Sequence, residues 1–382
     1  MTATYLYEGS VDKGLEGVVA CSSAISTIDG TTLLYRGYTI EDLALNASFE
    51  EVIHLLWFGN LPTSGQLAAF RDQLGESAKL PDEMRVWLLG MPTAAHPMDF
   101  LSAVVAGLTL HDPDSNQITR AATLRKAIRL TARLGQIVGA YEQVRRGRWP
   151  IEPDRGRSLA WNLLRSITGE APAPEVERDF EVCLILHADH ELNASAFSAR
   201  VTASTQSGLY SSVLSAIGTL KGPLHGGANQ AVISMLRDIR TRDRVEPYLA
   251  GLLQRREKVM GFGHRVYKDG DPRAKILRAM SQRLCESHGS REFHDISIRL
   301  ESLMADRKGL IPNVDFYSAT VYDALGIPDD LFTPVFAASR VAGWCAHVLE
   351  QYENNRIYRP RARYTGVRNL RYAPFTGRAK RT

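Results

Sequence analysis

The sequence contains few cysteines and no long uninterrupted apolar run. Its four cysteines, Cys21, Cys183, Cys285 and Cys345, lie far apart and form no C-x-x-C pair. This spacing is typical of a protein in a reducing compartment, and it argues against a disulfide framework or a zinc ribbon. Because no run of 18 apolar residues is present, we expect no membrane-spanning helix. The first residues lack a basic stretch followed by an apolar one, so we expect no signal peptide and a cytoplasmic protein.

Several well-known catalytic motifs are also missing. The segment Gly261-Phe262-Gly263 does not become a G-x-G-x-x-G dinucleotide motif, because position 266 is valine. The chain has neither a P-loop ending in Gly-Lys-Ser/Thr nor a G-x-S-x-G nucleophile elbow. Nucleotide hydrolysis and serine hydrolase chemistry therefore lose their main support.

Length and charge are those of an ordinary globular protein with one unusual end. A chain of 382 residues exceeds what one compact core usually holds, so two domains are expected. Residues 356–382 hold nine Lys/Arg and no Asp/Glu, against a net charge of +4 for the whole chain. The positive charge is therefore a local basic tail. Its expected partners are phosphates or carboxylates, with nucleic acid as a weaker alternative.

Apolar residues recur mainly at helical spacing, which predicts a mainly α fold. Ser48 and Glu51 form a capping box at the start of one apolar helix, and Thr63 and Gln66 repeat the pattern at the next. Within residues 15–38, the Asp-Gly pair at 29–30 lies between short apolar runs and predicts a small β-hairpin. Sustained strands are otherwise almost absent.

Later helices are predicted to carry chemically interesting side chains. Val176, Phe180 and His187 recur at helical spacing, which places His187 on a buried stripe. Asn193 is expected to cap the helix that follows. A long final helix is predicted from Thr333 to about residue 354, and it includes Arg340 and His347.

Two histidines stand next to glycines at breaks between predicted helices. His225 belongs to the run KGPLHGGAN at 221–229, and His264 belongs to GFGHRVY at 261–267. Glycine allows the backbone to approach a ligand closely. A new helix is expected just after residue 229, so His225 lies near a helix N-terminus, which favours developing negative charge. We therefore favour a functional site over a structural role for both histidines.

A metal centre is the less favoured reading of the histidines. His187 and His190 form an H-x-x-H pattern followed by Glu, which is neither H-E-x-x-H nor H-x-x-E-H. No cysteine joins the set, so we expect no metal. For His187 we expect a core histidine whose hydrogen bonds are satisfied.

One carboxylate and three arginines complete the candidates. Asp315 begins a predicted helix, and the sequence leaves a helix cap and a general base as equal alternatives. Arg273, Arg340 and Arg359 each have a surface role as the default. Together they would suit a di- or tricarboxylate, because guanidinium groups match carboxylates with two parallel hydrogen bonds.

From about Gly14 to Gly366 the chain resembles the citrate synthase family. The resemblance implies a nearly all-helical homodimer with a large domain (1–226 and 328–382) and a small helical domain (227–327) carrying the CoA-side loop. It also implies an acyltransferase that condenses oxaloacetate with acetyl-CoA and hydrolyses citryl-CoA to citrate and CoA. The matching blocks, in chain order, are YRGY at 35–38, HADHELNAS at 187–195, KGPLHGGAN at 221–229, GFGHRVY at 261–267, DPR at 271–273, NVDFY at 313–317 and RPR at 359–361.

The resemblance also assigns roles to individual residues. Asp315 would remove a proton from the thioester methyl group, His225 would stabilise the resulting enol, and His264 would protonate the oxaloacetate carbonyl. Acetyl-CoA would be a substrate, so neither a cofactor nor a metal is implied. The residues implied to bind oxaloacetate are His190, Arg273, Arg340 and, from the other subunit, Arg359. Those implied to bind CoA are Lys258, Val259, Met260, Gly261, Phe262 and Gly263.

Two departures and two alternatives accompany this resemblance. Tyr358 occupies a position that is usually aliphatic, and the tail after Gly366 matches no motif. The chain lacks the N-terminal extension of the NADH-regulated forms, so that regulation is not expected. Within the family, 2-methylcitrate synthase uses propionyl-CoA and shares every motif above. Outside it, the basic tail leaves open a non-enzymatic nucleic-acid-binding protein, although the set of histidines, Asp315 and arginines argues against it.

Overall fold

The computed structural model describes residues 13–263, 267, 270–287, 291–372 and 374–375. The chain divides into two compact units. One contains Ser23–Arg356, and the other combines the two termini, Met1–Ser22 and Ile357–Thr382. In the described part of the terminal unit, a short 3₁₀ helix at Lys13–Leu15 is the regular element near the N-terminus. The C-terminal segment exposes apolar side chains, Val367 and Tyr372 among them.

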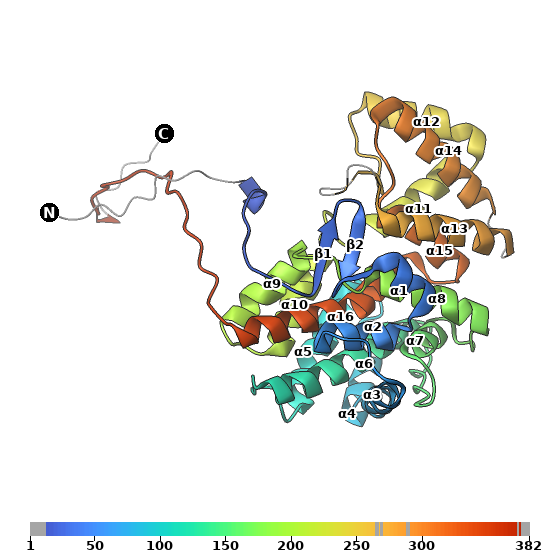
Figure 1. The fold of residues 1–382 in the computed structure, drawn as a ribbon. Coiled ribbons are helices and arrows are strands. Elements are labelled where there is room, and N and C mark those ends of the chain that lie inside the picture. The colour runs from blue at the N-terminus through green and yellow to red at the C-terminus, as the bar shows by residue number, and fades with distance from the viewer. Residues whose placement is uncertain (1–12, 264–266, 268–269, 288–290, 373, 376–382) are drawn as a thin grey trace. The chain divides into compact units, whose positions relative to one another are not determined.

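The larger unit is mainly helical, as the sequence predicts, and Figure 1 shows the arrangement of its elements. The first ten helices are α1 Ile40–Asn46, α2 Phe49–Phe58, α3 Ser64–Ser77, α4 Asp82–Leu89, α5 Pro97–Leu108, α6 Arg120–Arg145, α7 Leu159–Thr168, α8 Pro174–His187, α9 Ala194–Ser204 and α10 Leu209–Leu220. They are followed by α11 Ala228–Ile239, α12 Val245–Gln254, α13 Pro272–Ser287, α14 Arg291–Lys308, α15 Val314–Ala324 and α16 Phe332–Glu353. Short 3₁₀ helices lie at Thr109–His111, Arg242–Arg244 and Asp329–Leu331.

A small antiparallel sheet lies at the start of the larger unit. Strand β1 (Ser26–Asp29) pairs with β2 (Thr32–Tyr35), with Ser26 opposite Tyr35. The turn between them contains Gly30 with a φ of 60°, a conformation that glycine adopts without steric cost. The predicted hairpin is therefore present. A third strand, β3 (Tyr38–Thr39), pairs with β2 and was not predicted from the sequence.

The predicted helix starts are present in the structure. Ser48 and Glu51 form the reciprocal capping box of α2, and Thr63 and Gln66 form that of α3. Asn193 caps α9 by accepting hydrogen bonds from two backbone N–H groups. Each device satisfies N–H groups that would otherwise lack a partner in the first turn. Local sequence therefore sets where these helices begin.

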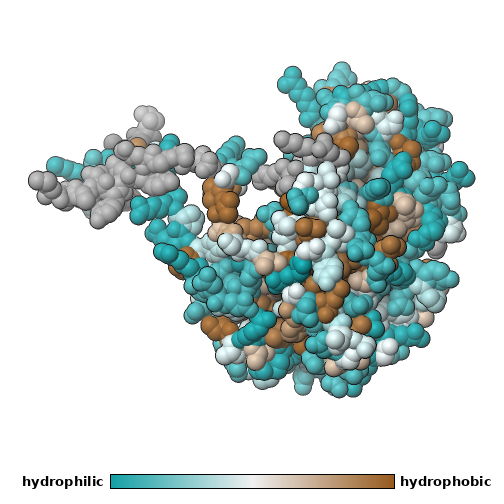
Figure 2. Space-filling view, in the orientation of Figure 1, coloured by the Kyte–Doolittle hydropathy of each residue, from teal (hydrophilic) through white to brown (hydrophobic). Residues whose placement is uncertain are grey.

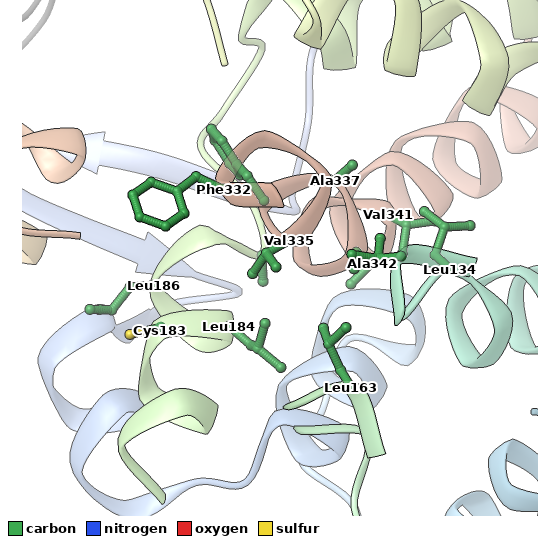
Figure 3. Packing of buried hydrophobic residues seen from close by; sticks show 14 of the residues in the cluster. Leu134, Leu163, Cys183, Leu184, Leu186, Phe332, Val335, Ala337, Val341 and Ala342 are labelled. Carbon is green, nitrogen blue, oxygen red and sulfur yellow. The ribbon is translucent and has the colours of Figure 1, made fainter. Parts of the chain in front are cut away.

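The core of the larger unit is centred on α16. This helix is buried along nearly its whole length and packs against α2, α6, α8, α9 and α10. Figure 3 shows Val335, Val341 and Ala342 of α16 among buried side chains from α6, α7 and α8. Its buried residues include the polar Arg340 and His347 as well as apolar side chains. Residues on α16 are therefore held by neighbours on every side.

Helices α11 to α15 lie together in Figure 1, and α15 packs against α11 and α13. The predicted small domain at 227–327 contains these five helices, and the domain division stays a prediction. On the face shown in Figure 2, hydrophilic and apolar side chains are interspersed over the larger unit. Among the described residues, no helix combines the length and apolar character needed to cross a bilayer.

Close packing between α6 and α7 gives a stability prediction. A Cβ at Gly139 in α6 would lie 2.0 Å from Ser166 Oγ, whereas a Cβ at Gly218 in α10 would meet nothing within 4 Å. We expect Gly139→Ala to lower the free energy of unfolding by about 1–3 kcal/mol through overpacking. Gly218→Ala should leave it unchanged or raise it by up to about 1 kcal/mol, because alanine favours helix.

Chemical denaturation of the two alanine variants beside the wild type measures both changes. Each variant adds the same single methyl group to a helix, so the pair separates packing from helix propensity. Equal effects of the two substitutions would contradict the close approach of α6 and α7.

Candidate active site

A pocket of about 960 Å³ is lined by two of the predicted catalytic residues and by the predicted CoA-side loop, whereas His190, Arg273 and Arg340 are not among its lining residues. His225 and Asp315, 90 positions apart in the chain, both line it. All six residues of the predicted CoA-side loop, 258–263, line the same pocket. The folded chain therefore brings the candidate base and the candidate hydrogen-bond donor to one cavity, beside the loop proposed to bind the cofactor-like substrate.

The turn between α10 and α11 positions His225. The His225 N–H donates to the Gly222 carbonyl at 2.9 Å, and the Gly226 N–H donates to the Leu220 carbonyl at 2.9 Å. A Cβ at Gly226 would lie only 2.5 Å from that Leu220 oxygen, so the turn requires glycine at 226. Helix α11 begins at Ala228, close after His225, as the sequence predicts.

A serine that the sequence analysis did not select as a site residue orients the His225 ring. His225 Nε2 lies 2.9 Å from Ser195 Oγ, which also accepts the indole N–H of Trp344 at 3.0 Å. Ser195 Oγ lies 2.8 Å from Asn193 Oδ1 as well, but it has a single proton to donate. Burial, followed by the charge of Arg340, lowers the pKa of His225 to about 4, so the ring is neutral near pH 7.

Asp315 is a buried carboxyl group in this pocket. Its Oδ1 is enclosed and has no hydrogen-bond partner among the described residues. Burial raises the pKa of Asp315 to about 7, although the positive charges of Arg273 and Arg340 act in the opposite direction. Desolvation of the charged form is therefore the dominant effect. A carboxyl group with this pKa suits proton transfer at neutral pH.

The structure tests one of the two alternatives left open for Asp315, the helix cap. The cap of α15 is Asn313, whose side-chain oxygen accepts the Asp315 N–H at 3.0 Å. The cap reading of Asp315 is therefore wrong. The first-turn position still exposes its carboxylate to the favourable end of the helix dipole, but burial outweighs that contribution.

Arg273 is buried and paired with a carboxylate in its own turn. Its Nε and Nη2 donate to the two oxygens of Asp271 at 3.0 and 2.8 Å. Asp271 Oδ1 also accepts the Arg273 N–H at 3.0 Å, as expected of a residue at the start of α13. The Val314 N–H donates to Asp271 Oδ2 at 3.1 Å. This pair therefore ties the start of α13 to the start of α15, which carries Asp315.

Arg340 is buried in the middle of α16, so the default surface role is wrong for this residue. Its Nε donates to the His187 carbonyl at 2.6 Å, and its guanidinium carbon lies 4.6 Å from the centre of the Phe336 ring. Burial lowers the pKa of Arg340 to about 10, so it is still charged at neutral pH. The Phe336 ring also lies 4.9 Å from the His187 ring and 6.5 Å from the His225 ring, measured between centroids.

His187 is buried in the core, as expected, with one of its two ring nitrogens paired. Its Nδ1 lies 2.7 Å from the Cys183 carbonyl and must therefore donate. Burial lowers the pKa of His187 to about 3, so the ring is neutral and Nε2 can only accept. No hydrogen-bond partner for Nε2 exists among the described residues, so the expectation that this histidine is fully satisfied is not met there.

The remaining predicted site residues divide into three cases. His190 is buried, with Nε2 3.3 Å from the Tyr267 hydroxyl oxygen, a partner that the sequence analysis missed. His264 lies outside the described residues. Arg359 is exposed and belongs to the terminal unit, so its service to a partner subunit stays a prediction.

The predicted CoA-side loop, 258–263, is anchored to the start of α15. The Asn313 N–H donates to the Gly261 carbonyl at 2.9 Å, and its side-chain nitrogen donates to the Gly263 carbonyl at 3.0 Å. Gly261 has a φ of 80°, and a Cβ there would lie 2.8 Å from Phe316 Cδ2, so glycine is required. The same asparagine thus caps the helix of Asp315 and holds the loop opposite.

Sequence reasoning missed several residues that shape this pocket. Ser195 lies in the HADHELNAS block and Asn313 in the NVDFY block, and membership of these blocks was the signal that could have identified them. Trp344 lies in no such block. Two further cations, Arg256 and Lys308, line the pocket beside Lys258. Within the described ranges, no cluster of three or more His, Cys, Asp or Glu side chains could hold a metal ion.

The protein is mainly helical, and its pocket holds a buried carboxyl group beside a neutral histidine. Comparison with known proteins gives the family. The family model described as citrate synthase, C-terminal domain, matches residues 14–361. Citrate synthase 2 of Bacillus subtilis is 49% identical over 96% of this chain and 99% of its own length. The chain belongs to the citrate synthase family. The predictions of this family, of an acyltransferase and of citrate synthase function are thereby confirmed.

Two further relatives bear on substrate and fold. The 2-methylcitrate synthase 1 of Corynebacterium glutamicum is 41% identical over 97% of this chain and 99% of its own length. The crystal structure of citrate synthase from Thermoplasma acidophilum, a ternary complex with carboxymethyl coenzyme A and oxaloacetate, superposes with a TM-score of 0.92. It shares 32% sequence identity and covers 97% of this chain and 100% of its own. The predicted fold class is confirmed.

The raised pKa of Asp315 predicts how Asp315→Asn changes stability with pH. In the unfolded chain this carboxyl group ionises near its ordinary value of 3.8, but in the folded protein near 7. Between these values, raising the pH favours the unfolded state of the wild type. Above about pH 7 the ionisation of Asp315 lowers the free energy of unfolding by a few kcal/mol relative to a pH below 3.8. The uncharged asparagine does not carry this cost.

Thermal unfolding of both proteins from about pH 5 to pH 8 measures the difference. We expect the stability of Asp315→Asn relative to wild type to rise across this range and then to level off. A relative stability that does not vary with pH would mean that the carboxyl group ionises normally in the folded protein.

Proposed function

We propose that this protein condenses oxaloacetate with acetyl-CoA in the described pocket and then hydrolyses citryl-CoA to citrate and CoA. One observation carries the assignment of the chemistry. The buried Asp315 carboxyl, with a pKa raised to about 7, lines the same pocket as His225. It also interacts electrostatically with the buried Arg273 and Arg340. Such a set provides a base, a hydrogen-bond donor and an anion site without a metal.

In the proposed first step, Asp315 removes a proton from the methyl group of the thioester. A carboxylate with an ordinary pKa would be a weak base for so weak a carbon acid. Raising the pKa by burial improves the driving force, while a useful fraction of the group stays ionised near pH 7. The Oδ1 atom has no hydrogen-bond partner among the described residues, so no described hydrogen bond to this atom lowers its basicity.

His225 is proposed to stabilise the enol oxygen that forms as the proton leaves. If the Ser195 hydroxyl donates to Nε2, the ring proton of the neutral imidazole must be on Nδ1, where it can donate to the substrate. Asn193 Oδ1 does not need the serine proton, because it already accepts the N–H groups of Ser195 and Ala196 at 3.1 Å each. A fixed neutral donor stabilises developing negative charge without reorganising.

The second substrate is proposed to bind through its two carboxylates. Arg273, Arg340 and His190 would hold oxaloacetate, with Arg359 of the partner subunit as a further cation. The enol carbon then attacks the oxaloacetate carbonyl carbon, and the carbonyl oxygen takes a proton from His264. A new carbon–carbon bond forms and gives citryl-CoA. Water then replaces the CoA sulfur at the thioester carbon.

The proposed division into a large domain (1–226 and 328–382) and a small domain (227–327) gives the pocket two sides. His225 would belong to the large domain, and Asp315 and the CoA-side loop to the small one. Closure of one domain on the other would exclude water from the enol until the carbon–carbon bond has formed. Such a division is consistent with a base that needs a dry environment.

Acetyl-CoA and propionyl-CoA differ by one methylene, which a binding site distinguishes by only about 1–3 kcal/mol. The comparisons include both citrate synthases and, at slightly lower identity, 2-methylcitrate synthases. We therefore propose acetyl-CoA as the preferred substrate, with propionyl-CoA as the alternative. Release of free CoA with oxaloacetate and each acyl-CoA in turn gives the ratio of the two kcat/KM values.

Replacing the proposed base gives the matching activity prediction. Asp315→Asn keeps the size of the side chain but removes its basicity. We expect kcat to fall by at least about 10²-fold, while oxaloacetate still binds. Turnover near that of the wild type would overturn the role of Asp315. A gel shift with nucleic acid, without synthase activity in the wild type, would instead support the non-enzymatic alternative.

The proposed homodimer shares Arg359 between subunits, and mixing two inactive variants tests this. Pro360 disfavours helical geometry at Arg359, so the chain is extended where this residue would reach a partner. In a closed two-fold dimer, a heterodimer of Arg359→Ala and Asp315→Asn subunits contains one site with both native residues. We expect activity to recover to about a quarter of wild type when the two are refolded together at random.

Refolding each variant alone provides the control, and both should remain nearly inactive. If Arg359 serves its own subunit instead, both sites of every heterodimer are damaged and the mixture stays inactive.

A further inference from the structure

One face of α16 holds the end of α8 by its backbone. Arg340 Nε donates to the His187 carbonyl at 2.6 Å, and one turn later the Gly343 N–H donates to the Ala188 carbonyl at 3.1 Å. A Cβ at position 343 would lie 2.3 Å from Asp189 Oδ1, so glycine is needed for this approach. The contact fixes the backbone that leads to His190, a residue proposed to bind oxaloacetate.

The next turn of α16 contacts the same segment through a side chain. His347 lies seven residues after Arg340, on the same face, and its Nε2 is 3.2 Å from Asp189 Oδ1. Neither atom has a hydrogen-bond partner within the described part of the chain, so they are each other's nearest polar contact there. The other oxygen, Asp189 Oδ2, accepts the Ser26 hydroxyl. The Asp189 carboxylate is fully buried, so these neighbours replace its water.

A buried arginine fixes which nitrogen of His347 carries the proton. Arg200 Nε lies 2.9 Å from His347 Nδ1, and arginine can only donate. Nδ1 must therefore accept, which places the imidazole proton on Nε2, facing Asp189. Arg200 is itself held by Gln351 at 3.1 Å and by the carboxylate of Glu350. The chain of contacts thus ends in a charged group with fixed geometry.

The backbone around Asp189 is held from the opposite side by the small sheet. The Tyr35 hydroxyl donates to the Asp189 carbonyl at 2.7 Å and accepts the Asp189 N–H at 3.0 Å. The Glu191 N–H donates to Ser26 Oγ at 2.8 Å, and Glu191 has a φ of 51°. A left-handed residue is sterically costly unless its neighbours determine it. His190 therefore lies between two residues whose backbone is fixed.

Charge supports the same arrangement. Burial alone would raise the pKa of Asp189, but His347, Arg340 and the Ser26 hydroxyl outweigh it, and the pKa lies below its ordinary value. The carboxylate is therefore ionised in the core. An ionised buried carboxylate that loses one of its few partners is strongly destabilised, so the segment has one favourable position.

We propose that Asp189, His347 and Arg200 form a positioning relay that fixes His190 and Arg340 for binding a dicarboxylate. The inference rests on the proposed function, since it takes both residues to bind oxaloacetate. Asp189 directly precedes His190, and the His187 carbonyl is the hydrogen-bond partner of Arg340. A shift of the relay therefore displaces both binding groups together, and small displacements of such groups have large effects on catalysis.

Substitution of His347 tests the relay by separating the two substrates. His347→Leu removes both contacts, whereas His347→Gln keeps one acceptor and one donor. We expect His347→Leu to raise KM for oxaloacetate at least about tenfold and to change KM for acetyl-CoA less than about twofold. His347→Gln should restore KM for oxaloacetate to within about threefold of wild type.

Cys345→Ala is the matched control, because Cys345 is buried on α16 two residues from His347 and points to another side of the helix. It should lower Tm without changing KM for oxaloacetate. An unchanged KM in His347→Leu, or an equal rise in Cys345→Ala, would overturn the relay. Should His347→Leu fail to fold, Asp189→Asn removes the charge with a smaller change of shape. It should likewise raise KM for oxaloacetate much more than KM for acetyl-CoA.

Hydrogen exchange of the free protein gives a readout that does not depend on activity. In His347→Leu the amides of Asp189 and Glu191 should exchange at least about tenfold faster, and in Cys345→Ala they should not. If the wild type neither binds nor turns over oxaloacetate, the proposed function fails, and exchange alone then decides the relay. Exchange in His347→Leu equal to that in wild type would exclude it.

Discussion

Burial of charged side chains in a helical core is the constraint on which this structure depends. Transferring an ion out of water costs several kcal/mol unless neighbours replace the water. Arg273 meets this cost with two hydrogen bonds to Asp271, and Arg340 meets it with a backbone carbonyl and an aromatic ring. Asp315 is buried with no described hydrogen-bond partner for its Oδ1, and burial raises its pKa. The raised pKa that suits Asp315 to act as a base thus arises because its neighbours do not fully offset the cost of burying its charge.

The fold provides what this constraint requires. A buried charged group stays dehydrated only if the surrounding backbone does not open to let water in. Helix α16 is buried along nearly its whole length, and Gly343 brings it close enough for its N–H to reach the end of α8. The start of α15 is fixed in a similar way, through Asn313 and Asp271. The rigid start of α15 therefore presents Asp315 to the pocket.

Local sequence predicted the parts of the fold that depend on local interactions. The two capping boxes, the Asp-Gly hairpin and the Asn193 cap each involve residues only a few positions apart, so their patterns are visible in the chain. At the start of α15 the pattern was ambiguous. Asn313 and Asp315 are both good capping residues, and the outcome depends on which one has extended backbone geometry. The sequence alone does not specify that geometry.

The site residues that sequence reasoning missed are those whose partners are distant in the chain. Ser195 contacts His225 across 30 positions, and Arg200 contacts His347 across 147. Neither pair has a characteristic spacing, because the contacts arise from how helices pack. The resemblance to a family supplied residues that are proposed to touch substrate, but not those that determine which nitrogen of a histidine ring carries the proton. Which nitrogen of a histidine can donate depends on the atom that the other ring nitrogen contacts, and that contact can be identified only in the folded chain.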